Sequence, residues 1–150
     1  MPVDNLPTNG AAAGSNGRPL ILYAYAESET ARANFKFFIK MGLHAAADFV
    51  FIFNGDTDAA GLLPRDKDNI KTVQRANTCF DLGAYGEILR KDDLYKRYKR
   101  FIVMNASIRG PFLPHWAQGC WTDMYLNRLS SEVKVSSGAF LPEPKTRWKA

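Results

Sequence analysis

The chain has 150 residues, of which 46% are hydrophobic, 13% aromatic and 23% charged, and its net charge is +5. This composition favours one globular domain with a packed core over a disordered chain. The two cysteines are too few for the disulfide framework of a small secreted protein, and no apolar stretch reaches the length of about 20 residues that spans a membrane. The positive charge is compatible with an anionic partner.

Strand and helix patterns alternate from Pro19 onward. Apolar runs predict buried strands over residues 19–26, 48–55 and 100–105, and a more exposed strand over 69–77. Apolar side chains at helical spacing predict helices over 29–45, 81–98 and 120–133, the first of them capped by Ser28 or Thr30. This order predicts an α/β fold, a three-layer sandwich with a mainly parallel sheet.

The two ends of the chain have a different composition from the part between them. Residues 1–18 form a leader rich in Gly, Ala, Asn and Pro, which we expect to be disordered. This leader lacks the basic and apolar regions of a secretory signal. Residues 136–150 form an irregular tail that carries Lys145, Arg147 and Lys149. The folded domain is therefore predicted to cover residues 19–135.

Polar residues follow each predicted strand. Parallel strands end at one edge of a sheet, and ligands of such folds collect there, so the segments 25–27, 54–58, 75–81 and 105–109 are predicted to converge. In the second segment, Asp56 and Asp58 form an Asp-x-Asp motif, which can chelate Mg²⁺ or Mn²⁺ on a nucleotide diphosphate. Aspartates in such a loop also serve ordinary turn geometry, and both interpretations stay open here.

The segment 75–89 places Asp81 where a helix N-cap is expected, with Gly83 and Gly86 in the first turns. The small residues allow a ligand to approach a helix N-terminus that favours phosphate, or they ease packing of the helix on the sheet.

After the fourth strand come Asn105, Ser107 and Arg109. Arg109 can clamp a diphosphate or form a surface salt bridge. The sequence contains no zinc-ligand spacing, no G-x-S-x-G elbow and no phosphate-binding P-loop motif.

Two phrases, NTCFDLGAYGEIL and YKRFIVMNASIRGPFLP with the later CWTDMYL, carry a resemblance to a known family. They resemble glycosyltransferase-like proteins of fungi, algae and bacteria that are related to the rhamnan-synthesis F family. The resemblance covers roughly residues 19 to 135 and implies a GT-A-like, Rossmann-related fold that binds a nucleotide-diphosphate sugar and transfers the sugar to a glycan hydroxyl. In that family's fold the first strand's end and the loop after the second strand hold the base, and metal-binding carboxylates follow the fourth strand.

The resemblance assigns roles to residues of this chain. It implies that Tyr25, Asp56, Asp58, Asn77 and Asn105 contact the donor, and that the catalytic set Asp81, Ser107 and Arg109 faces the sugar and the diphosphate. The usual metal position falls on residues 105–107, where no carboxylate stands, so we assign no metal ligand and leave the need for Mg²⁺ or Mn²⁺ open. Asp81 is the nearest substitute.

The resemblance also concerns the extent of the domain and its partners. Domains of this family continue with further strands and helices, and we expect this chain to be a truncated donor half with an exposed sheet edge through which two copies pair. The expected partners are a nucleotide-sugar donor and, in longer relatives, a glycan acceptor, with no nucleic acid. One alternative is a non-catalytic nucleotide-binding or interaction module. Another is a basic surface for nucleic acid or anionic lipid, which requires Lys and Arg on one face with aromatic residues between them.

Overall fold

The computed structural model describes residues 17–78 and 80–133. The chain divides into two compact units, Met1–Ala117 and Gln118–Ala150. Of the predicted leader, only Gly17 and Arg18 belong to the described residues, and the predicted tail lies outside them. Among the described residues no helix is both long and apolar enough to cross a membrane.

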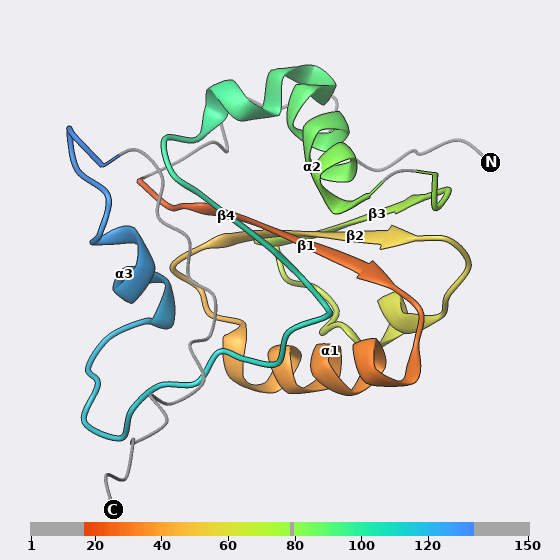
Figure 1. The fold of residues 1–150 in the computed structure, drawn as a ribbon, viewed down its shortest axis with the longest axis horizontal. Helices are drawn as coiled ribbons and strands as arrows, with labels where there is room; N and C mark the ends of the chain where they lie inside the picture. Colours follow the sequence, from red (N-terminus) through yellow and green to blue (C-terminus); the bar gives the residue numbers. More distant parts are fainter. Residues whose placement is uncertain (1–16, 79, 134–150) are drawn as a thin grey trace, which may run out of the picture. The chain divides into compact units, whose positions relative to one another are not determined.

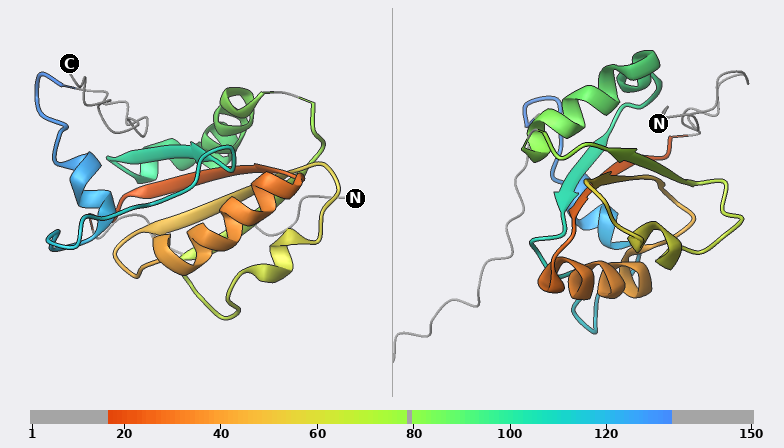
Figure 2. Two further views of the ribbon diagram at one scale, coloured as in Figure 1. Left: turned by 60° about the horizontal axis from the view of Figure 1, so that its bottom comes forward. Right: turned by 90° about the vertical axis from the view of Figure 1, so that its right-hand side faces the viewer.

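The first unit contains one four-stranded parallel sheet with the strand order β3-β2-β1-β4 (Figure 1). Its elements are, in chain order, β1 (Leu20–Ala26), α1 (Glu29–Gly42), β2 (Asp48–Asn54), η1 (Ala59–Leu62), β3 (Ile70–Arg75), α2 (Asp81–Arg90), η2 (Lys91–Arg97) and β4 (Phe101–Asn105). All three strand pairs are parallel. Helix α1 covers one face of the sheet and α2 the other, as Figure 2 shows. The predicted α/β three-layer sandwich with a parallel sheet is therefore confirmed.

The two faces of the sheet have different chemistry. Side chains of one strand alternate between faces, so β1 sends Tyr23 and Tyr25 toward α1 and sends Leu20, Leu22 and Ala24 toward α2. Under α1 lies an aromatic cluster, made of Tyr23, Tyr25, Phe35, Phe38, Phe49, Phe51 and Phe53. Under α2 lies an aliphatic cluster that includes Val50, Ile52, Val73 and Ile88. Both faces are buried, which explains the continuous apolar runs of β1 and β2.

Helix α1 begins and ends on identifiable residues. Ser28 caps it, because the Ser28 side chain accepts a hydrogen bond of 3.0 Å from the N–H of Ala31. The helix ends at Gly42 rather than at residue 45 as predicted, since Leu43 is already extended. Gly42 packs so closely against Phe38 that a Cβ atom there would lie 2.6 Å from the Phe38 ring.

The helix predicted over 81–98 is wrong beyond residue 90. Asp92 and Asp93 adopt left-handed backbone angles, with φ of 52° and 55°, and α2 gives way to the 3₁₀ segment η2. Aspartate adopts such angles more readily than most residues other than glycine, but they cannot continue an α-helix. Leu94 nevertheless packs into the aliphatic cluster, so the apolar spacing that suggested one helix has a real packing origin.

Strand β4 is less buried than its apolar sequence predicts. It pairs only with β1 among the described strands, and Val103 is 48% exposed. The prediction of a buried strand is wrong here because an edge strand has a neighbour on one side only. The expectation of an exposed edge agrees with the structure, while pairing of two copies stays a prediction.

The described part of the second unit contains helix α3 (Trp121–Leu126). It is shorter than the predicted helix over 120–133. Trp121 and Tyr125, one turn apart, pack with their ring centroids at 6.1 Å, and Trp121 and Leu126 are buried.

Candidate functional site

The strands end together at one side of the sheet, which we call the carboxyl edge. The register pairs Ala26 of β1 with Asn54 of β2, and Asn54 with Arg75 of β3. The chain moves from β1 to β2 on one side, but β4 lies on the other side of β1, so the strand order reverses between β1 and β4. Ligands of open α/β sheets bind at such a reversal. The four strand ends that we predicted to converge therefore share this edge.

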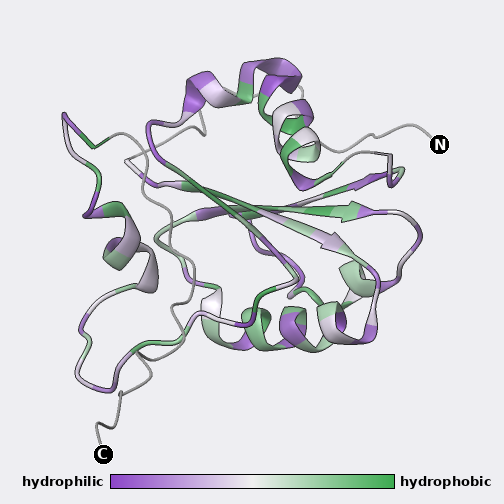
Figure 3. Cartoon of the chain, in the orientation of Figure 1, coloured by the Kyte–Doolittle hydropathy of each residue, from purple (hydrophilic) through white to green (hydrophobic). Residues whose placement is uncertain are grey.

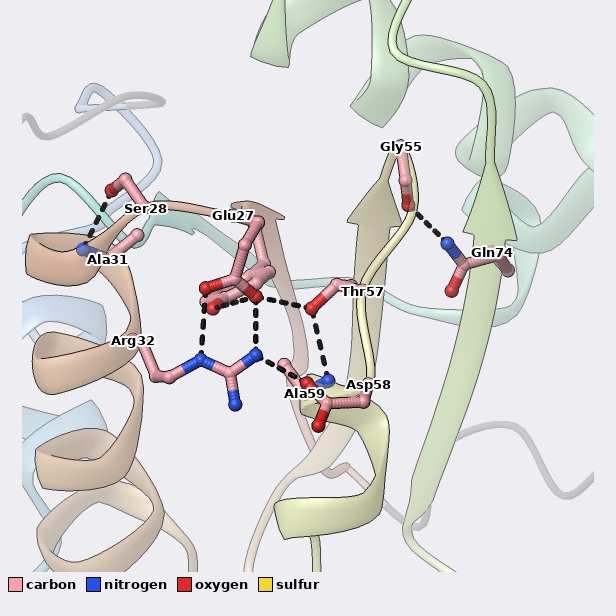
Figure 4. A network of polar contacts seen from close by, with 10 residues as sticks. Glu27, Ser28, Ala31, Arg32, Gly55, Thr57, Asp58, Ala59 and Gln74 are labelled. Carbon is pink, nitrogen blue, oxygen red and sulfur yellow. Dashed lines mark hydrogen bonds and ion pairs between the residues drawn. The ribbon is translucent and has the colours of Figure 1, made fainter.

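A network of polar side chains joins β1, α1 and the loop after β2 (Figure 4). The guanidinium of Arg32 binds both carboxylate oxygens of Glu27, with N···O distances of 2.9 and 2.7 Å. The same guanidinium forms an ion pair with Asp58. Thr57 and Tyr25 each donate a hydrogen bond to Oε2 of Glu27, at 2.5 and 3.0 Å. This network holds the loop after β2 against the first turns of α1.

The network determines the charge state of its carboxylates. Hydrogen bonds from Arg32 and Thr57 lower the pKa of Glu27 to about 2, and the hydrogen bond from Arg32 lowers the pKa of Asp58. Burial, and then the bond to Glu27, raise the pKa of Tyr25. Both carboxylates are therefore ionised at neutral pH. Asp58, one half of the Asp-x-Asp motif, is already engaged by Arg32, whereas Asp56 is exposed to solvent.

A second pair connects α2 with the end of β4. Nδ2 of Asn105 donates a hydrogen bond of 2.5 Å to Oδ2 of Asp81, and Oδ1 of Asn105 accepts one of 3.1 Å from the N–H of Ser107. Tyr85 of α2 donates to the carbonyl of Met104 at 2.6 Å, which docks the helix on this strand end. Three residues predicted for the site, Asp81, Asn105 and Ser107, are thus brought together beside the strand-order reversal.

Asp81 differs from its prediction in one respect. The N-cap of α2 is Phe80, and Asp81 is the first residue of the helix. Phe80 has no polar side chain with which to cap the helix, and the carboxylate of Asp81 accepts from Asn105. The prediction of Asp81 as the N-cap is therefore wrong by one residue. The consequence is that its carboxylate lies at the end of β4 instead of closing its own helix.

Arg109 does not join this group. Its guanidinium lies 4.6 Å from the ring centroid of Phe37, which in turn packs against Phe112 at 5.0 Å. Phe37 is eight residues after the start of α1, about 12 Å along the helix. The buried Asn34 side chain donates to the carbonyl of Ala106 at 2.9 Å and directs the loop after β4 along α1. The structure therefore places Arg109 beside the middle of α1.

Asn77 lies close to the turn that follows β2. Gly55 begins this turn with a φ of +82°, and a Cβ atom on Gly55 would lie 3.5 Å from Cβ of Asn77. A glycine suits this position because the left-handed backbone disfavours other residues. The exposed Asn77 is thus close to the turn that carries the exposed Asp56.

The sequence interpretation missed Glu27 and Arg32, and it also missed a buried arginine. The side chain of Arg75 is only 7% exposed and bonds Oδ1 of Asn54 and the carboxylate of Glu87, both at 2.7 Å. The sequence does contain a signal for this burial. Arg75 is the last residue of β3 and lies on the same face of the strand as the buried Val73. Arg75 fastens α2 to the ends of β2 and β3.

The carboxyl edge is acidic. Among residues 17–78 and 80–133 it carries six carboxylates, against the two guanidinium groups of Arg32 and Arg75, both of which are ion-paired. The carboxylates belong to Glu27, Glu29, Asp56, Asp58, Asp81 and Glu87. Among the described residues, however, no group of three or more His, Cys, Asp or Glu side chains is arranged to hold a metal ion. The edge is thus rich in acceptors for ligand hydroxyl groups and poor in positive charge for a phosphate.

The structure defines this chain as an α/β protein with a Rossmann-like parallel sheet and a polar edge at the strand-order reversal. Comparison with protein-family models, curated proteins and solved structures finds no match. Membership of a glycosyltransferase family therefore stays a prediction that depends on the two sequence phrases.

Proposed function

We propose that the first unit binds a nucleotide-diphosphate sugar at the carboxyl edge, as the donor-binding part of a GT-A-like glycosyltransferase. The single observation that carries this proposal is the group Asp81, Asn105 and Ser107 beside the strand-order reversal. This is where open α/β sheets bind nucleotides. The group offers a carboxylate and an amide, which can bind sugar hydroxyls, and Ser107 joins it through its backbone N–H.

In this proposal the ligand lies across the edge from the β2 loop to α2. Asp56, with Asn77 nearby, contacts the nucleoside hydroxyls, while Glu27, Arg32 and Asp58 hold the loop in shape. Asp81 and Ser107 face the sugar and the diphosphate. Arg109 is not given a phosphate-binding role, because it stacks on Phe37.

The residues at the edge do not fit a resident Mg²⁺ or Mn²⁺ site of the kind that the resemblance implies. Asp58 is paired with Arg32, residues 105–107 carry no carboxylate, and Asp81 is the single carboxylate at the end of β4 among the described residues. A diphosphate nonetheless meets an edge of net negative charge, and like charges repel. The binding test therefore includes samples with and without added divalent cation.

A second candidate is a non-catalytic nucleotide-binding module with the same ligand. What favours it is the engagement of Glu27 and Asp58 by Arg32, together with the missing carboxylate at residues 105–107. Both candidates predict binding of a nucleotide sugar, and only the first predicts cleavage of the donor.

The test is calorimetric titration of the whole chain with UDP-, GDP- and dTDP-sugars, with and without Mn²⁺. Asp81→Asn is expected to weaken binding by about ten- to a hundredfold, the effect of losing a hydrogen bond to a charged group. Asp68→Asn is the matched control, because Asp68 is exposed and precedes β3 at the opposite end of the sheet. Absence of binding heat for every donor with folded protein contradicts the proposal. Binding without donor hydrolysis selects the second candidate.

A further inference from the structure

Six of the chain's 20 Lys and Arg residues lie in one short stretch, residues 90–100, which we call the basic segment. It contains six cations against two carboxylates, so it contributes +4 of the net charge of +5. The cations are Arg90, Lys91, Lys96, Arg97, Lys99 and Arg100, and the carboxylates are Asp92 and Asp93. Figure 3 shows the η2 part of this stretch as predominantly hydrophilic.

The basic segment is fixed to the body of the first unit. Leu94 is 7% exposed and belongs to the aliphatic cluster under α2. The hydroxyl of Tyr98 donates to Oδ2 of Asp48 at 2.8 Å, and the carbonyl of Arg100 accepts from the N–H of Leu20 at 3.0 Å. These anchors hold the backbone while the side chains of Lys96, Arg97 and Lys99 remain exposed.

The chain enters the η2 part of the basic segment through two residues in the left-handed conformation. The consecutive left-handed residues Asp92 and Asp93 turn the chain between α2 and η2, so that Leu94 reaches the core and the cations that follow lie outside. Asp93 pairs with Lys96 at 2.9 Å, but the remaining cations outnumber the carboxylates of the segment. Left-handed residues other than glycine persist where the surroundings determine them, and they are over-represented at functional positions.

The basic segment and the carboxyl edge lie at opposite ends of the sheet. Tyr98 contacts Asp48, the first residue of β2, and Arg100 directly precedes β4, whereas Asp81 and Asn105 lie at the far end of β4. The five residues of β4 separate the two regions by about 13 to 16 Å. The first unit is therefore positive at the amino ends of its strands and negative at their carboxyl ends.

We propose that the basic segment binds the surface of a membrane that contains anionic phospholipids. A flat anionic surface attracts the basic segment and repels the acidic carboxyl edge, so this charge distribution orients the unit with its strand carboxyl ends away from the lipid. Tyr95, which is 46% exposed beside Lys96, suits the headgroup region. Single-stranded nucleic acid is less well matched, because binding by stacking needs several exposed aromatic rings and Tyr98 is held by Asp48.

The proposal is tested by co-sedimentation of the whole chain with vesicles of phosphatidylcholine, with and without 30% phosphatidylserine. Binding is expected only with phosphatidylserine, and it should weaken severalfold between 50 and 500 mM NaCl, because salt screens surface charges. Replacing Lys96, Arg97 and Lys99 together by Gln is expected to reduce the partition coefficient roughly fivefold per charge, on the order of a hundredfold in all.

The matched control replaces three other exposed lysines, Lys36, Lys40 and Lys71, by Gln. This variant lowers the net charge by the same amount but leaves the basic segment intact. Its partition coefficient is therefore expected to fall by less than tenfold. An equal fall of the partition coefficient in the two variants overturns the proposal, since net charge alone then explains binding to the vesicles. Absence of wild-type binding to the phosphatidylserine vesicles also overturns it, whether or not the variants fold. Binding to a DNA duplex that depends on the basic segment, without vesicle binding, assigns the surface to nucleic acid instead.

Discussion

The hydroxyl of Tyr23 provides the sharpest stability test in this fold. Tyr23 is 1% exposed, and its ring packs against Phe35, Phe38 and Phe51 with centroid distances of 4.7 to 5.6 Å. Its hydroxyl has no hydrogen-bond partner among the described residues. Burial also raises the pKa of this hydroxyl, because a phenolate has no stabilising surroundings there.

We expect Tyr23→Phe to stabilise the protein. An unpaired hydroxyl in an apolar core costs about 1 to 3 kcal/mol, and its removal creates only a small space, so a net gain of about 1 kcal/mol is expected. For a unit of this size, such a gain raises the melting temperature by about 4 to 8 °C. Urea denaturation followed by circular dichroism measures the free energy of unfolding, and the slope with urea should not change.

The control for this variant is Tyr85→Phe. Tyr85 is also buried, but its hydroxyl donates to the carbonyl of Met104 at 2.6 Å. Removal of that donor is expected to lower the free energy of unfolding by about 1 kcal/mol or more. The two variants delete the same atom from the same residue type, so the reasoning predicts opposite signs. A loss of stability in Tyr23→Phe similar to that in Tyr85→Phe refutes it.

Three further predictions concern other contacts. Because the folded-state pKa of Glu27 is lowered to about 2 by Arg32 and Thr57, its ion pair stabilises the fold above pH 4.5 and is lost as the pH falls toward 2. The free energy of unfolding of Glu27→Gln should therefore fall less than that of the wild type between pH 4.5 and 2. If acid titration gives the two proteins the same pH dependence, the lowered pKa of Glu27 is contradicted. Gly42→Ala should lower the free energy of unfolding by about 1 to 3 kcal/mol, because its Cβ meets the ring of Phe38. A Cβ atom on Gly86 of α2 would meet open space, so Gly86→Ala should raise the free energy of unfolding by about 0.5 to 1 kcal/mol. If both alanine variants raise this free energy, or both lower it, the reasoning is refuted. Arg75→Met leaves the buried Asn54 without its guanidinium partner and should cost about 1 to 3 kcal/mol in thermal unfolding, whereas an unchanged melting temperature shows that this contact is not needed.

The parallel sheet and its helices were predictable because burial on both faces leaves a strong trace in the sequence. The runs of β1 and β2 are apolar at nearly every position, which only a strand covered on both sides requires. The division into an aromatic face and an aliphatic face becomes visible only with the register, which places Tyr23 and Phe51 on the same side.

Two errors in the predicted elements have a common physical cause. Apolar spacing reports which side chains are buried, but it does not report the backbone path between them. Leu94 keeps the spacing of a continuing helix although Asp92 and Asp93 are left-handed, and no glycine or proline marks the break. In β4 the composition is that of a central strand, while the topology makes it an edge.

The candidate site was predictable to the extent that chain topology determines it. The end of β4 and the start of α2 both lie at the carboxyl edge in any fold with this strand order, so the proximity of Asn105 and Asp81 follows from the topology. The partners of arginines depend instead on loop paths and on the reach of side chains. Arg109 stacks on Phe37 because the side chain of Asn34 donates a hydrogen bond to the carbonyl of Ala106, which holds the loop after β4 along α1. These two bonded residues are 72 positions apart in the sequence. Arg32, one turn into α1, lies at the carboxyl edge instead, where it pairs with Glu27 and Asp58 after β1 and β2.

The positions of the arginines bear on how the proposed nucleotide sugar can be held. In the described part of the chain, Arg32 and Arg75 are the cations of the carboxyl edge, and their charges are opposed by Glu27, Asp58 and Glu87. A diphosphate at this edge must therefore obtain its favourable contacts from backbone N–H groups, such as those in the first turn of α2, or from a cation that arrives with it. Sugar and ribose hydroxyls face no such conflict, since carboxylates accept hydrogen bonds from them. If the proposed ligand binds here, this charge distribution predicts that its sugar and nucleoside ends supply most of the specificity, and that its phosphates depend most on added divalent cation.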